Sequence, residues 1–91
     1  MKTYLIGYDL RRPGQDYSSL FEAIKSYPSW YHMIDSTWLI GTDRSAAEIR
    51  DHLLQHIDHN DALFVGRLSG EAAWYGLAVD GTNWLKGQLA A

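Results

Sequence analysis

The stretch TYLIGYDL, Thr3 to Leu10, decides the fold. Its side chains are mostly aromatic or aliphatic, which is typical of a buried strand, and the turn signal Arg11-Arg12-Pro13-Gly14 follows it. Beyond this turn, apolar residues recur with the i, i+3, i+4, i+7 spacing of a helix that we expect Asp16 to cap and Pro28 to end. The buried stripe of this helix comprises Tyr17, Leu20, Phe21 and Ile24.

Two strand-like runs come next, Trp30 to Ile34 and Thr37 to Gly41, and the Asp35-Ser36 turn between them predicts a hairpin. The segment Ser45-Ala46-Ala47-Glu48 has the spacing of a capping box and predicts the start of a second helix. We expect that helix to end at His59-Asn60-Asp61, and a fourth strand to run from Ala62 to Leu68. The buried stripe of the second helix comprises Ala46, Ile49, Leu53 and Ile57.

The order strand, helix, strand, strand, helix, strand predicts an α+β, ferredoxin-like βαββαβ domain, with an antiparallel sheet and both helices on one face. The other face must then be polar, bind a ligand or pair with a second copy. After the fourth strand, Trp74-Tyr75-Gly76 is a candidate edge strand, and Thr82 is a candidate cap of a short helix through Trp84 and Leu85. The tail from about residue 72 packs on its own sheet or exchanges with a dimer partner.

Length and composition narrow the class of protein. A chain of 91 residues, 46% hydrophobic and 21% charged, predicts a single domain over residues 1–91. The net charge of -3 argues against a basic nucleic-acid coat, so any contact with nucleic acid must be local. No cysteine is present, no secretory signal is evident, and the apolar runs are shorter than the roughly 20 residues of a membrane span. We therefore expect a cytoplasmic protein with no membrane partner.

Asp9 is the most informative candidate site residue because it ends an otherwise apolar strand. One interpretation is a ligand for a hard divalent cation such as Mg²⁺ or Mn²⁺, which would activate water or bind phosphate. The other interpretation is structural: Asp9 accepts backbone hydrogen bonds in the turn or pairs with Arg11 or Arg12. One carboxylate is a poor metal site by itself, but a two-fold dimer would supply the same residue again.

Basic residues provide two further candidates. Arg11 and Arg12 form the only adjacent basic pair and are candidate phosphate contacts, although a solvated loop pair is the more common explanation. His52 and His56 have an i, i+4 spacing that suits zinc, with His59 close by, but the H-E-x-x-H glutamate is absent. Histidines near the end of a helix, where the dipole favours their charge, are the simpler interpretation.

Aromatic residues make up 13% of the chain, more than a core of this size buries without leaving some on a surface. We expect a dimer interface on the uncovered sheet face, although stacking of nucleic-acid bases is an alternative use for such rings. The candidate interface residues are Trp30, Trp38, Trp74 and Tyr75.

The segments TYLIGYDL, WYHMIDSTWLIGT, SAAEIRDHL and GEAAWYG together resemble the SinR-like proteins, which are related to the second CRISPR-associated core protein and to the VapD-type ribonucleases. D-S-T-W at 35–38 and A-W-Y-G at 73–76 are the most specific parts of the resemblance. The resemblance implies a ferredoxin-like homodimer. In the CRISPR-associated relatives an aspartate at the position of Asp9 is assigned to metal-dependent cleavage of nucleic acid. The acidic charge of this chain does not fit a role in spacer acquisition.

Three hypotheses follow from the sequence. The first is a homodimeric endonuclease, cutting RNA or DNA with Asp9 as the ligand of Mg²⁺ or Mn²⁺. The second is a non-catalytic dimeric binding or scaffold module that uses the aromatic open face of its sheet. The third is a small metabolite sensor on the same fold.

Overall fold

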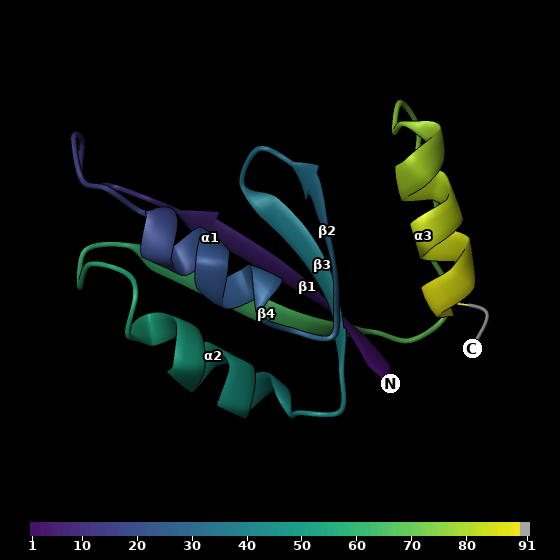
Figure 1. Cartoon of the computed structure of the whole chain (residues 1–91), viewed down its shortest axis with the longest axis horizontal. Coiled ribbons are helices and arrows are strands. Elements are labelled where there is room, and N and C mark those ends of the chain that lie inside the picture. The colour runs from purple at the N-terminus through teal and green to yellow at the C-terminus, as the bar shows by residue number, and fades with distance from the viewer. Residues whose placement is uncertain (90–91) are drawn as a thin grey trace.

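The computed structural model describes residues 1–89 and has the expected α+β class: a four-stranded antiparallel sheet with three helices (Figure 1). The strand order is β2-β3-β1-β4, so the first strand of the chain is hydrogen-bonded on both edges. The strands are β1 (Lys2–Asp9), β2 (Ser29–Ile34), β3 (Thr37–Thr42) and β4 (Ala62–Leu68). The helices are α1 (Ser18–Lys25), α2 (Ala46–Leu54) and α3 (Val79–Leu89).

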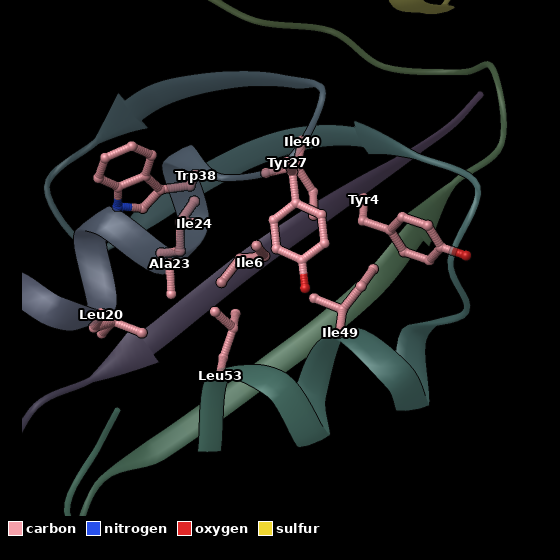
Figure 2. Close-up of a cluster of buried hydrophobic side chains, with 10 residues drawn as sticks. All are labelled: Tyr4, Ile6, Leu20, Ala23, Ile24, Tyr27, Trp38, Ile40, Ile49 and Leu53. Atoms are coloured by element: carbon pink, nitrogen blue, oxygen red, sulfur yellow. The ribbon is translucent and has the colours of Figure 1, made fainter. Parts of the chain in front are cut away.

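The core lies between one face of the sheet and helices α1 and α2 (Figure 2). The register places Ile6 of β1 opposite Trp38 of β3 and Val65 of β4, so these three side chains share the helix-covered face. Each of the two helices contributes its apolar stripe to this face, as their sequences predict. The buried cluster comprises Tyr4, Ile6, Leu20, Ala23, Ile24, Tyr27, Trp38, Ile40, Ile49 and Leu53.

Helix α1 begins at Ser18, with Tyr17 rather than Asp16 at its N-cap position. The Asp16 carboxylate still accepts a hydrogen bond from the Ser18 amide at 2.9 Å, which gives a local turn in place of a capped helix end. Tyr17 does not belong to the buried stripe, because its hydroxyl donates to Asp61 at 3.0 Å. The prediction that Asp16 caps this helix is therefore wrong by one residue.

Helix α2 has the predicted capping box: the Glu48 amide donates to Ser45 Oγ at 3.1 Å, and the Ser45 amide donates to Glu48 Oε1 at 3.0 Å. The helix ends at Leu54, several residues before the predicted end at 59–61. The Asp58 side chain accepts the Asn60 amide at 3.2 Å, so the chain forms a side-chain-stabilised turn instead of continuing the helix.

The third helix lies on the opposite face of the sheet, apart from the other two (Figure 1). Trp84 donates to Ser29 Oγ at 2.9 Å, and its ring lies 6.1 Å from that of Tyr31. This helix starts at Val79, so Thr82 is not its cap; Thr82 instead accepts a hydrogen bond from the Trp74 indole at 3.1 Å. Residues 74–76 form no strand, contrary to the sequence prediction. The helix contacts β2 and the start of β1, and on this face Thr3 of β1 and Leu39 of β3 are buried. Asp9 at the other end of β1 and Phe64 of β4 remain exposed.

Two glycines of α3 differ in the space that the docked helix leaves for a Cβ atom. A Cβ on Gly81 would lie 2.0 Å from the Tyr31 hydroxyl oxygen, whereas a Cβ on Gly87 would meet nothing within 4 Å. We predict that Gly81→Ala lowers the melting temperature and changes the fluorescence of Trp84, because the helix must move away from Tyr31. Gly87→Ala is the matched control and should stabilise the protein slightly, by at most about 0.5–1 kcal/mol from helix propensity. Equal melting temperatures for the two variants would contradict this docking.

Candidate functional site at the end of the central strand

Asp9 is the last residue of β1, and its side chain is 66% exposed on the face of the sheet that α1 and α2 do not cover. It pairs in the register with Ala62 of β4, and Phe64, two residues further along the same strand, is 64% exposed. A shallow hollow of about 250 Å³ lies between them, lined by Gly7, Tyr8, Asp9, Ala62, Leu63 and Phe64. The structure therefore places an exposed carboxylate beside an exposed aromatic ring, at the end of the central strand.

Both arginines of the Arg11-Arg12 pair form ion pairs with acidic residues of the same chain. Arg11 Nε donates to Asp9 Oδ2 at 2.9 Å, and Arg12 Nη1 donates to Asp58 Oδ1 at 3.0 Å. The two guanidinium side chains remain 55% and 62% exposed, so the rest of each faces solvent. Carboxylates of the same chain therefore compensate both arginine charges. This agrees with the structural interpretation given above, in which Asp9 pairs with one of the two arginines.

Asp61 joins the loop after β1 to the turn before β4. Its Oδ1 accepts hydrogen bonds from the Arg11 amide at 2.7 Å and from the Tyr17 hydroxyl at 3.0 Å, and its Oδ2 accepts the Asp58 amide at 2.8 Å. This one carboxylate thus fixes the backbone at Arg11, two residues from Asp9. The sequence does not predict this role, because there Asp61 is only part of an expected helix end. The only available signal was the pair of aspartates at 58 and 61.

The two aspartates of this turn are stabilised in their charged forms. Burial raises the pKa of Asp61, but hydrogen bonds from the Arg11 and Asp58 amides and the Tyr17 hydroxyl outweigh it and hold this pKa below its usual range. The Asn60 amide, and then Arg12, hold the pKa of Asp58 below its usual range against a smaller opposing effect of burial. Both groups therefore favour the folded state while they are ionised.

No three histidine or acidic side chains within residues 1–89 are grouped so that they could hold a metal ion. Asp9 therefore belongs to no such group among these residues, and it is the only acidic residue that lines the hollow beside Phe64. The other candidate metal site, the histidines at 52 and 56, lacks further ligands as well within the part of the chain that the structure describes. His52 and His56 lie with ring centroids 5.8 Å apart, but the Tyr27 hydroxyl already occupies His52 Nδ1 at 2.8 Å. His59 lies near Asp58 instead, at 3.7 Å.

The aromatic residues are distributed differently from the prediction. Trp38 is only 2% exposed and lies on the helix-covered face, where His32 stacks on it with ring centroids 4.0 Å apart. The expectation that Trp38 lies on the uncovered face is wrong, because strand alternation places it on the same side as Ile6. Trp30 shares that face at the exposed edge strand β2, and Tyr75 is fully exposed in the tail.

Phe64 is the aromatic ring exposed on the uncovered face, and sequence analysis missed it. The β4 stretch ALFVGRL is apolar on both sides, so its alternation does not distinguish Phe64 from its buried-facing neighbours Leu63 and Val65. The ring folds back over Gly66, where an added Cβ would lie 2.6 Å from a ring carbon. Gly66 thus leaves the space in which Phe64 lies flat against the sheet.

No protein-family model matches this chain. The fold is similar to that of a hypothetical protein, TT1823, from Thermus thermophilus, with a TM-score of 0.64. The two chains are 21% identical, and the match covers 82% of this chain and 90% of the other. At this identity the likeness shows a shared fold. Among residues 1–89, no helix has both the length and the apolar character needed to cross a membrane.

The depressed pKa of Asp61 predicts the direction of its effect on stability. A carboxyl group whose pKa is lower in the folded than in the unfolded state stabilises the fold above the unfolded value of about 3.9, and this contribution is lost as the pH falls through the folded value. Asp61→Asn should therefore be less stable than the parent protein at pH 7, and the difference should shrink as the pH falls below about 4. Urea unfolding across this range measures it.

Asp43→Asn is the control for this experiment, because Asp43 has an 88% exposed side chain whose ion pair, with the N-terminus, is 3.7 Å long. It should change stability little at any of these pH values. If Asp61→Asn and Asp43→Asn have the same profile, the hydrogen bonds to Asp61 do not hold the two loops together.

Proposed function

We propose that this chain is a ferredoxin-like protein of the SinR-like type that acts on nucleic acid as a homodimer, with Asp9 as the ligand of a divalent metal ion in phosphodiester cleavage. The observation that carries the proposal is the exposed Asp9 carboxylate at the end of the central strand. The strand order β2-β3-β1-β4, with α1 and α2 packed on one face, supports the ferredoxin-like assignment.

The dimer follows from the chemistry of this site. Mg²⁺ and Mn²⁺ prefer several oxygen ligands, and one chain offers a single carboxylate here. A two-fold axis near the hollow between Asp9 and Phe64 would bring the second Asp9 to the same place and cover the exposed Phe64 ring. Arg11 pairs with Asp9 Oδ2 and leaves the other carboxylate oxygen for a metal ion. An ion held there would supply electrophilic activation of a phosphodiester oxygen or of water.

The arginines would bind the substrate locally. Arg11 and Arg12 lie directly after Asp9, and each has a half-exposed guanidinium whose remaining N–H groups face solvent. Such groups donate paired hydrogen bonds to phosphate oxygens. The overall charge of -3 restricts nucleic-acid binding to this neighbourhood. The absence of cysteine supports a cytoplasmic site of action.

The activity can be tested on single-stranded and double-stranded RNA and DNA with Mg²⁺ or Mn²⁺. We predict cleavage that EDTA abolishes and that Asp9→Asn reduces at least about 100-fold, because the charged metal ligand is lost. Asp43→Asn, an exposed aspartate beyond the opposite end of β1, is the matched control and should cut at the parental rate. Cleavage by Asp9→Asn at the parental rate, from equally pure protein, would contradict the proposal.

A second candidate function is a non-catalytic dimeric binding module, and the exposure of Phe64 beside internally paired arginines favours it. This candidate needs the same assembly but no turnover on nucleic acid. Trp74 and Tyr75 of the tail remain candidate contacts of such an interface. Trp30 lies on the helix-covered face at the opposite edge of the sheet, and the buried Trp38 would affect assembly only through the fold.

Both candidates predict that Phe64 contributes to self-association. Phe64→Ser should weaken the dimer at least about tenfold in sedimentation equilibrium, since a large exposed aromatic ring is lost from the interface. Leu54→Ser is the control, because Leu54 is 48% exposed on α2, away from this face. A dimer of unchanged affinity in Phe64→Ser would place the interface elsewhere, and a protein that stays monomeric at all concentrations would contradict both candidates.

A further inference from the structure

A second hollow lies at the other end of the sheet from Asp9. It has a volume of about 720 Å³ and opens between the turn after α1, the end of β3 and the exposed side of α2. Thr42, which lines it, pairs with Lys2 at the start of β1, whereas Asp9 ends that strand. The hollow is therefore separate from the proposed nucleic-acid site, and none of its groups takes part in it.

A buried tyrosine and a histidine form the floor of this hollow. Tyr27 is only 7% exposed and reaches toward α2 (Figure 2), where its hydroxyl lies 2.8 Å from His52 Nδ1. The two rings meet edge to face with centroids 5.5 Å apart. This contact occupies one ring nitrogen and sets the direction of the other, Nε2, which makes no hydrogen bond within residues 1–89.

The charged side chains around the hollow differ in the hydrogen bonds and ion pairs that they already form within the chain. The Glu48 carboxylate accepts the Ser45 amide in the capping box, and Asp51 Oδ1 pairs with both Nε and Nη2 of Arg50 at 3.0 Å. Arg44, in contrast, has no carboxylate within 4.0 Å among residues 1–89. The Glu48 and Asp51 carboxylates each use one oxygen in these contacts, and Glu48 also interacts electrostatically with Arg44. Arg44 and His52 can therefore offer N–H groups to an anion without first breaking an ion pair.

We propose that this hollow binds a phosphate monoester, with the phosphate held by the Arg44 guanidinium and by His52 Nε2–H. Arginine donates in parallel to two phosphate oxygens, and His52 donates a third bond in the tautomer whose Nδ1 accepts the Tyr27 O–H and whose Nε2 carries the hydrogen. The hollow is larger than phosphate alone requires and falls within the size range of small-molecule sites, so the organic part of the ester has room.

Binding should be linked to protonation of His52. Burial, then His56 and Arg44, lower the pKa of His52 in the free protein. Glu48 and Asp51 also line the hollow, and Tyr27 faces the ring from the turn after α1. A phosphate dianion beside Nε2 stabilises the imidazolium form and should therefore raise the pKa of His52. The dianion should bind more tightly as the pH falls from about 7.5 toward 6, where the second pKa of the ester lies.

Adenosine 5′-monophosphate and inorganic phosphate are suitable probes, titrated into the protein by NMR while the His52 ring signals are followed from pH 5 to 8. We expect saturable binding of the nucleotide that shifts the His52 titration upward. Arg44→Gln should weaken this binding at least about tenfold and remove the shift of the His52 titration. Adenosine without its phosphate should not bind.

Arg67→Gln is the matched control. Arg67 is an exposed arginine on β4 that forms no ion pair within residues 1–89 and does not line the hollow, so this variant makes the same change in net charge. It should bind as the parent does. The proposal is wrong if the two variants lose affinity equally, if the His52 titration does not respond to the nucleotide, or if adenosine binds as well as its monophosphate. These outcomes are independent of nuclease activity at Asp9.

Discussion

The structure depends on one constraint, the hydrogen bonding of β1 on both edges. A strand held between β3 and β4 must send alternate side chains to opposite faces of the sheet. Tyr4 and Ile6 consequently lie in the core beneath α1 and α2, and Asp9 projects from the other face. A shift of one residue in this register would bury the Asp9 carboxylate under the helices, where it would need compensation for the loss of its solvent. The apolar core and the exposed acid are thus fixed by the same strand.

Local signals in the sequence predicted most of the elements. The Ser45 to Glu48 capping box and the hairpin turn at 35–36 appear in the structure where their short-range chemistry places them. The errors have two causes, one local and one that depends on distant residues. Helix α2 ends early because the Asp58 side chain bonds the backbone of its own turn, and a helical spacing of apolar residues does not reveal that competition. The face on which Trp38 lies depends on the pairing of β3 with β1, which residue types alone do not specify.

The sequence predicts only part of the candidate site, because most contacts of this site join residues far apart in the chain. The position of Asp9 at the end of a buried strand is visible in the sequence, but its neighbours come from a turn about fifty residues later. Asp61 holds the Arg11 backbone, so that Arg11 pairs with Asp9, and Asp58 pairs with Arg12; both arginine side chains are thus compensated within the chain. Phe64 was hidden because β4 is apolar on both faces. These arrangements explain why an acidic protein can carry a pair of arginines without presenting a broad positive surface.

The central claim is that the uncovered face brings two Asp9 carboxylates together around a single metal ion. The most direct measurement is the stoichiometry of Mn²⁺ binding, followed by electron paramagnetic resonance in the parent protein and in Asp9→Asn. The account predicts about one Mn²⁺ for every two chains in the parent protein and none in the variant at the same concentration. One ion per chain, or unchanged binding in Asp9→Asn, would contradict it.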